Sequence, residues 1–294
     1  MVEQKIEFRK TRDFGENLND TFLFIWLNFK PLLQSFLAIC AIFMLFQAIL
    51  EGLYESGYST LSQLIFSRQR FISGLKGHFS DAQYYMIRLS KWLTFISVHV
   101  SVNAYIKCYV ENNGAKPGIE KVWNMFKKYY FKVLLLSLPI IILVSLGIVL
   151  FVAPGVYLIV VLLPFSIIAM AENKSFTDTM IRSFDLIRNN FWPSFLIYCV
   201  AVIIYIVSSF FTGLIITGIL GVVNFFTNYD LSSTIAVLTS FFEIFTFCFY
   251  IVVLVSVALN YYNLVEKKEG TGILNRINKI GNDMPQPGNT DELY

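Results

Sequence analysis

The sequence predicts an all-α polytopic membrane protein, in which six transmembrane helices form three parallel repeats of an interfacial amphipathic helix followed by a transmembrane hairpin. The 294-residue chain is 56% hydrophobic and 15% charged, whereas a soluble domain carries about 25% charged residues. Lys132 and Glu172 enclose 39 uncharged residues, and Arg188 and Asp230 enclose 41. One membrane crossing needs only about 20. A motif that occurs twice in the chain indicates the repeat.

Six segments bounded by charged residues are predicted to cross the membrane. The run between Lys132 and Glu172 is too long for one crossing, and the sequence "APG" at 153–155 supplies a turn that divides it into the third and fourth spans. Residues 1–265 would then form one membrane domain, followed by a short cytoplasmic tail at 266–294. The other predicted spans are 31–50, 90–110, 191–218 and 234–262, and 219–233 is a connecting turn.

The distribution of Lys and Arg predicts that both termini are cytoplasmic. Short cytoplasmic loops hold most of the basic residues of a membrane protein. The N-terminal segment has five, the stretch from Lys107 to Lys132 six, the loop after the fourth span three and the tail four, whereas 153–155 and 221–233 have none. The region 52–91 is an exception, because it carries five basic residues on the predicted outer side.

The repeated motif reads "FGENLNDTFLFIWLNFKPLL" at 14–33 and "FTDTMIRSFDLIRNNFWPSF" at 176–195. In the first copy an apolar residue recurs every three or four positions, which is the pattern of one helix face. Asp13 and Ser175 precede the two copies and are suitable N-cap residues. The apolar stripe comprises Phe14, Leu18, Phe22, Ile25 and Phe29, and in the second copy Phe176, Met180, Phe184, Ile187 and Phe191.

A third and weaker version of the motif begins at Gly118 and continues as "GIEKVWNMFKKYYFKVLL". Amphipathic helices are therefore predicted in the membrane interface at about 14–29, 119–130 and 176–191. Every copy contains one tryptophan, a residue that is favoured at the interface between membrane and water. These tryptophans are Trp26, Trp123 and Trp192.

The segments "FRKTRDFGENLNDTFLFIWLNFKPLL", "SFTDTMIRSFDLIRNNFWPSF" and "YYNLVEKKEGTGILNRINKIG" together resemble a group of bacterial integral membrane proteins. These are similar to the membrane domain that accompanies some glycerophosphoryl diester phosphodiesterases. The resemblance implies a six-span domain in a bacterial inner membrane. It implies no enzyme activity, because the phosphodiesterase chemistry of that family belongs to a separate soluble domain.

The sequence contains no motif that indicates catalysis, a cofactor or a metal site. His78 and His99 are too far apart for the helical zinc motif, and no Gly-rich phosphate loop is present. The four cysteines show no CxxC spacing, which favours reduced packing residues. The net charge of +3 is explained by topology and indicates no nucleic acid partner. The expected partners are membrane lipids, a membrane protein or a second copy of the chain.

A few polar residues within the predicted spans are candidates for function. Glu243 lies in the sixth span, where a charge costs roughly 2.5–3.5 kcal/mol. His99 and Asn103 are four residues apart on the second span and therefore share a helix face, which favours packing through hydrogen bonds and leaves open a proton path or ligand site. A stripe of small residues on the fifth span predicts close helix packing. It comprises Ser209, Gly213, Thr217 and Gly221.

Two functional hypotheses follow from these patterns. The first is a non-catalytic membrane module that organises lipid or partner proteins through its interfacial helices and basic loops. The second is a small transporter or lipid-handling permease that uses Glu243 as its ionisable group. The sequence favours the first, because transporters usually show more polar residues or broken helices than this sequence displays.

Overall fold

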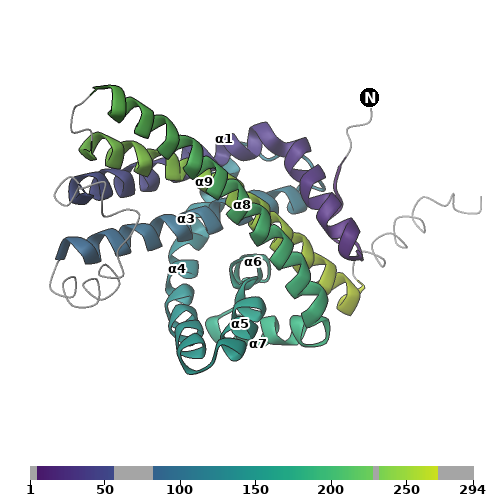
Figure 1. Cartoon of the computed structure of the whole chain (residues 1–294). Coiled ribbons are helices and arrows are strands. Elements are labelled where there is room, and N and C mark those ends of the chain that lie inside the picture. Colours follow the sequence, from purple (N-terminus) through teal and green to yellow (C-terminus); the bar gives the residue numbers. More distant parts are fainter. Residues whose placement is uncertain (1–4, 56–81, 228–231, 271–294) are drawn as a thin grey trace, which may run out of the picture.

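The computed structural model describes residues 5–55, 82–227 and 232–270, which are helical apart from the N-terminal segment and short connections (Figure 1). Within these ranges the side chains of some helical residues, including 232–244, are not described. The all-α prediction is confirmed, since the described residues contain no strand. The helices are α1 (Phe14–Glu55), α3 (Ala82–Glu111), α4 (Ile119–Leu150), α5 (Val152–Leu162), α6 (Phe165–Ala171), α7 (Phe176–Ile187), the 3₁₀ turn η3 (Arg188–Asn190), α8 (Phe191–Thr227) and α9 (Ser232–Glu269).

Five helical segments of the described chain are long and apolar enough to cross a membrane. They are compatible with a polytopic membrane protein. Helix α3 coincides with the predicted second span but is not among the five, so the presence of six spans stays a prediction. The five segments are Phe14–Glu51, Ile119–Leu150, Val152–Ala171, Phe176–Val223 and Phe245–Glu269.

Both predicted N-caps are confirmed by hydrogen bonds at the helix starts. The Asp13 carboxylate accepts a bond of 2.7 Å from the backbone N–H of Glu16, and the Glu16 carboxylate accepts one of 3.2 Å from the N–H of Asp13. This reciprocal pair is a capping box, which supplies acceptors for backbone N–H groups that have no partner within the helix. Ser175 Oγ accepts from the N–H of Asp178 at the start of α7.

Two of the three predicted interfacial segments are not separate helices. Residues 14–29 are continuous with the first predicted span in α1, and 119–130 are continuous with the third in α4. Pro31 lies inside α1, and a proline within a helix produces a kink where its ring meets the preceding turn. Figure 1 shows α1 changing direction along its length. Only the 176–191 segment is set apart, as α7, and the interfacial placement of all three stays a prediction.

The two copies of the repeated motif bury equivalent positions. In the first copy these residues lie beside the apolar stripe, whose Phe14 and Phe22 are exposed. In the second copy the stripe itself packs against the core, and its Ile187 is fully buried. The similarity concerns this local pattern, and the threefold repeat of the whole chain stays a prediction. The equivalent buried pairs are Asn17 and Thr179, Thr21 and Ser183, and Phe24 and Leu186.

The predicted turn at 153–155 lies inside a helix. Helix α4 ends before Phe151, whose backbone is extended, and residues 153–155 form part of the first turn of α5. A proline is tolerated there because N–H groups in the first turn have no partner in the helix. The predicted connecting turn at 219–233 is also largely helical, because α8 continues to Thr227 and α9 begins at Ser232.

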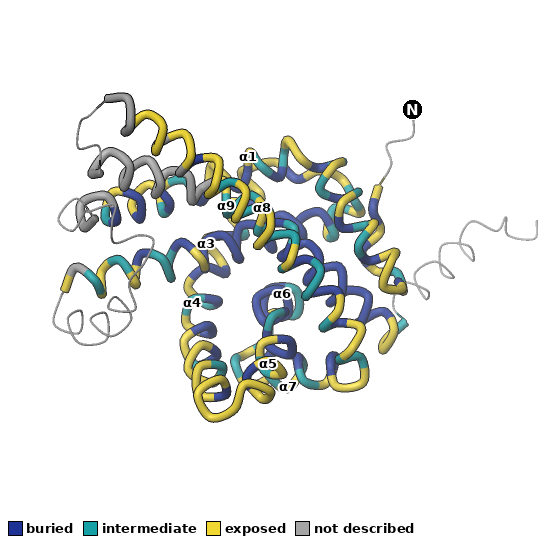
Figure 2. Tube along the Cα trace, viewed as in Figure 1, coloured by how far each residue is buried: buried dark blue, intermediate teal, exposed yellow. Residues whose placement is uncertain are grey.

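Helices α3 and α9 form the centre of the protein. Every residue from Ile96 to Tyr109 in α3 and from Val253 to Glu266 in α9 is buried, so both helices are covered on all sides. Helix α1 packs against both of them, and α8 covers α9. Figure 2 shows α6 also in dark blue, whereas the hairpin of α4 and α5 is largely exposed at its tip. In Figure 1 the α4–α5 hairpin extends toward the bottom of the view, whereas α1, α3, α8 and α9 extend toward the left.

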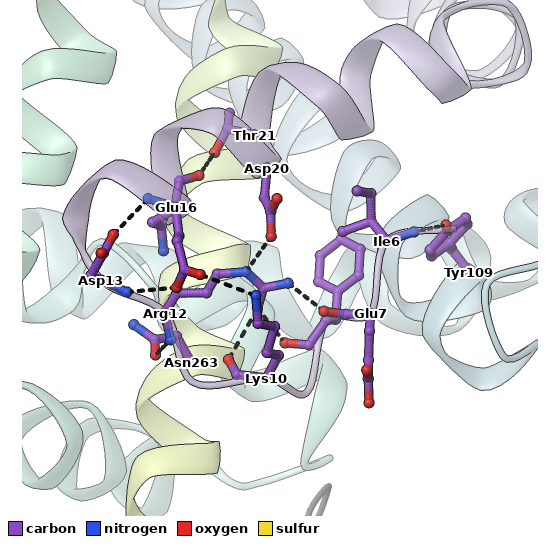
Figure 3. A network of polar contacts seen from close by, with 12 residues as sticks. Ile6, Glu7, Lys10, Arg12, Asp13, Glu16, Asp20, Thr21, Tyr109 and Asn263 are labelled. Atoms are coloured by element: carbon purple, nitrogen blue, oxygen red, sulfur yellow. Dashed lines mark hydrogen bonds and ion pairs between the residues drawn. The ribbon is translucent and has the colours of Figure 1, made fainter. Parts of the chain in front are cut away.

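The N-terminal segment binds across one end of this bundle through Arg12. The Arg12 side chain is 1% exposed and donates to the Asp20 carboxylate at 2.7 Å, as well as to backbone carbonyls of the segment (Figure 3). Its backbone N–H donates to Asn263 Oδ1 of α9 at 2.8 Å, and the N–H of Ile6 donates to the hydroxyl of Tyr109 at the end of α3. The basic N-terminal segment therefore lies at the end of the bundle where α3 and α9 terminate.

We expect Gly155→Ala to destabilise the protein, because α4 and α5 approach closely at this residue. A Cβ at Gly155 would lie 2.7 Å from the backbone nitrogen of Ile148, and overpacking of this kind costs about 1–3 kcal/mol. The matched control is Gly218→Ala in α8, where a Cβ would meet no atom of the described chain within 4 Å. Unfolding in detergent, followed by circular dichroism, measures both. Equal stability of the two variants would contradict the close approach.

Candidate functional site

The side chains at every fourth position of α3 from residue 91 form a ridge in which five of the six residues are polar. This spacing follows one of the ridges that side chains make on a helix surface. The ridge begins and ends with charged residues, and its centre is buried. We call it the α3 ridge, and it comprises Lys91, Phe95, His99, Asn103, Lys107 and Glu111.

His99 and Asn103 meet a common partner at the centre of the protein. Asn103 Nδ2 donates to Ser166 Oγ at 2.9 Å, and His99 Nδ1 lies 3.3 Å from the same oxygen. His99 Nε2 lies 3.0 Å from the hydroxyl of Tyr250 on α9. Hydroxyls can donate or accept, so both imidazole nitrogens are satisfied in either neutral tautomer. The predicted shared face of His99 and Asn103 is confirmed.

Ser166 reaches this centre because the fourth predicted span is a broken helix. Helix α5 ends at Leu162, and Pro164 precedes α6, which places the short and almost fully buried α6 against α3. Proline cannot donate a backbone hydrogen bond, which accounts for the interruption. Interrupted helices are tolerated at membrane depth where protein or water surrounds them.

Lys107 continues the ridge by one turn beyond Asn103. Its ammonium group donates to the hydroxyl of Tyr129 at 3.1 Å and to the backbone carbonyl of Met170 near the end of α6. It also lies 4.8 Å from the centre of the Tyr129 ring. A carboxylate oxygen of Glu111 lies farther away, at 3.8 Å from the ammonium nitrogen. Neutral acceptors therefore hold this nearly buried cation.

A cavity of about 380 Å³ opens at this end of α3. Ion pairs connect its walls: Glu172 accepts from Lys174 and Arg182, both at 2.9 Å, and Arg182 also pairs with Glu269 of α9. We call it the charged cavity. Its charged lining consists of Arg9, Lys107, Lys174 and Arg182 with Glu111, Glu172 and Glu269.

Glu172 lies between α6 and α7, and its environment favours the charged form. Burial opposes ionisation of this carboxyl, but hydrogen bonds from Lys174, Arg182 and Tyr261 outweigh burial and lower the pKa of Glu172 below its ordinary value of 4.5. Since these partners come from α7 and α9 as well as the loop, the carboxylate joins three parts of the chain at this end.

A second cavity, of about 480 Å³, opens at the other end of the α3 ridge. Its α3 lining includes Lys91 and Phe95, and the Lys91 ammonium pairs with Glu51 of α1 at 2.6 Å. We call it the aromatic cavity. Its full lining is Gln47, Lys91, Trp92, Phe95, Tyr205, Thr246 and Phe247, from α1, α3, α8 and α9.

Aromatic rings close the ridge between the aromatic cavity and His99. The Phe95 ring lies 4.5 Å from the His99 ring and 5.5 Å from the Tyr250 ring, between centroids. Tyr205, which lines the cavity, contacts Tyr250 at 5.3 Å. The polar centre is thus separated from this cavity by one layer of side chains.

The other predicted site residues do not join this arrangement in the described structure. Glu243 and Thr217 belong to α9 and α8, but their side chains lie outside the described residues. A Cβ at Gly213 or Gly221 would meet no described atom within 4 Å, so the described atoms do not test the predicted close packing against the neighbouring helix, where the side chains of 232–244 are not described. The three predicted interfacial tryptophans are all exposed: Trp26, Trp123 and Trp192.

Sequence reasoning missed three residues of the site, namely Lys107, Ser166 and Tyr250. The spacing of His99 and Asn103 extends by four to Lys107, and this signal could have identified the lysine. No comparable signal marks Ser166 or Tyr250, because only the tertiary fold brings α6 and α9 to α3.

No protein-family model, curated protein or solved structure matches this chain. The resemblance to the membrane domain that accompanies glycerophosphoryl diester phosphodiesterases therefore stays a prediction. Within residues 5–55, 82–227 and 232–270, no group of three or more His, Cys, Asp or Glu side chains could hold a metal ion.

We expect Ser166→Ala to destabilise the protein by about 1–3 kcal/mol, because the amide of Asn103 and Nδ1 of His99 would lose their buried partner. The control is Thr212→Ala in α8, where the hydroxyl bonds only to the carbonyl of Ser208 in its own helix and the change should stay within about 0.5 kcal/mol. Denaturant unfolding in detergent compares them. A Ser166 variant as stable as the control would show that the hydrogen bonds contribute nothing.

We expect acid to weaken the ion-pair network around Glu172. Its lowered pKa means that the folded protein favours the charged form, so this stability is present above pH 4.5 and is lost as the pH falls through the folded value. The measurement is thermal unfolding of the wild type and Glu172→Gln from about pH 7 down to about pH 3.5, which is one unit below the ordinary pKa of 4.5. The variant should lose part of the acid sensitivity. An identical pH profile would contradict the assignment.

Proposed function

We propose that this chain is a small membrane permease whose path follows the α3 ridge. The observation that carries this proposal is that the α3 ridge has a cavity at each end and is polar and buried from His99 to Lys107. Phe95 and Lys107 line different cavities and are separated by about 18 Å along the helix. His99 and Asn103 lie between them.

The broken helix beside the ridge supports the same function. Transporters place their binding sites near interrupted helices, where free backbone groups and polar side chains can contact a solute. Here α6 supplies Ser166 to the polar centre and the Met170 carbonyl to Lys107. The sequence favoured a non-catalytic module because it displays few polar residues and no evident broken helix, and α6 supplies both features. The path proposed here uses α3 and does not depend on Glu243.

We further propose that the protein lies in the bacterial inner membrane with both termini in the cytoplasm. The distribution of basic residues supports this orientation. Contacts at the charged cavity support it too, because Arg9 of the N-terminal segment, Lys174 after α6 and Glu269 near the C-terminus line one cavity. The charged cavity would then face the cytoplasm and the aromatic cavity the outside.

The second candidate function is the non-catalytic module that organises lipid or a partner protein. Trp26 and Trp192 favour it, because their side chains are 81% and 70% exposed, and exposed tryptophans anchor proteins in the membrane interface. Purification in native lipid followed by mass spectrometry of bound lipids and proteins would test it. Retention of a defined lipid or partner without any solute flux would favour this module over the permease.

The permease proposal is tested with single cysteines in a cysteine-free background, reconstituted in proteoliposomes. Currents after concentration jumps of small ions should stop when a bulky maleimide is attached at position 103. The control is position 42, whose side chain is 70% exposed and lies on α1 away from the ridge. Cysteines at 95 and 107 should react with an impermeant reagent from opposite sides. Absence of current for every ion, or equal inhibition at 42 and 103, would reject the proposal.

A further inference from the structure

We infer that the charged cavity binds a phosphate-type oxyanion and that Lys107 is its anchor. This inference rests on the proposed permease function and deepens it, because it names the chemistry that enters the path from this side.

Lys107 is a buried cation with incomplete charge compensation. Its side chain is 11% exposed, and two of its three N–H donors are used by the Tyr129 hydroxyl and the Met170 carbonyl, which are uncharged. The Glu111 side chain is 46% exposed, and its oxygen lies 3.8 Å from the ammonium nitrogen, beyond hydrogen-bond distance. An anion in the cavity could therefore supply the charge-assisted partner that these contacts do not provide.

Two of the three carboxylates of the same cavity are engaged by other cations. Glu172 is held by Lys174 and Arg182, and Glu269 by Arg182. The third, Glu111, lies 3.8 Å from Lys107, so the closest contacts of the Lys107 ammonium group remain the two neutral oxygens. The buried ammonium group therefore keeps part of its positive potential toward the cavity, whose lining has four basic and three acidic side chains.

The lining and size favour an oxyanion with several acceptor atoms. About 380 Å³ lies within the usual range of small-ligand pockets. A phosphate group can accept from Lys107 while its other oxygens face the basic residues of the opposite walls, as in anion-selective pores lined by Lys and Arg. Beyond Lys107, the ridge continues with Asn103 and Ser166, which are uncharged hydrogen-bonding groups.

Calorimetric titration of the full-length protein in detergent with sodium phosphate, at constant ionic strength, tests the inference. Saturable binding is expected, with about tenfold weaker affinity in Lys107→Gln because one charge-assisted hydrogen bond is lost. Lys107→Arg should retain binding. Lys127→Gln is the matched control, since Lys127 lies over the Trp123 ring and does not line the cavity.

A second arm distinguishes free phosphate from a phospholipid headgroup. The same variants are placed in nanodiscs with anionic or zwitterionic lipid, and retained lipid is identified by native mass spectrometry. Phosphate binding that depends on Lys107 supports a free anion, whereas retention of one phospholipid that depends on Lys107 supports a headgroup. If neither ligand binds, or if Lys127→Gln weakens binding as much as Lys107→Gln, the inference is wrong.

A labelling experiment keeps the inference testable if Lys107→Gln does not fold. In the wild type, phosphate should protect Lys107 from acetic anhydride, as read by peptide mass spectrometry, and should leave Lys127 reactive. Absence of protection would overturn the site. These measurements need no gradient across a membrane, so a failed transport assay beside intact phosphate binding would reject the permease function and keep the anion site.

Discussion

Hydrocarbon offers no hydrogen-bond partner, and this constraint determines how the helices surround α3. A polar group buried without a partner costs several kcal/mol in that environment. Three polar residues of the α3 ridge, His99, Asn103 and Lys107, therefore require partners from other helices. Helix α6 supplies Ser166 and a backbone carbonyl, α9 supplies Tyr250, and α4 supplies a tyrosine hydroxyl. The polar centre of α3 is consequently enclosed by the helices that supply these partners.

The break before α6 has both a structural and a functional consequence. Pro164 prevents one straight helix, and the resulting short α6 turns its serine toward α3 while its last carbonyls face Lys107. The same break brings the loop with Glu172 to the end of α9, where Arg182 and Glu269 complete an ion-pair network.

Local signals in the sequence identify the elements but not their contacts. Asp13 and Ser175 were predicted as N-caps from the preference of short polar side chains for that position, and His99 and Asn103 were placed on one face by their spacing. Residues 14–29 and 31–50 were predicted as two helices, whereas α1 continues through both ranges and contains Pro31. Ser166 and Tyr250 could not be predicted, because their role arises from the packing of α6 and α9 on α3, and no local pattern encodes that packing.

An ion pair accounts for one of the five basic residues that depart from the orientation rule. Lys91 lies on the predicted outer side, where basic residues are disfavoured, but it pairs with Glu51 at 2.6 Å, so the pair adds little net charge to that end. At the opposite end Glu172 and Glu269 pair with Lys174 and Arg182, whereas the closest contacts of Lys107 are neutral oxygens. The two ends of the ridge therefore differ: one has a close ion pair, and the other has a nearly buried cation held by neutral groups, which is the feature on which the proposed anion site rests.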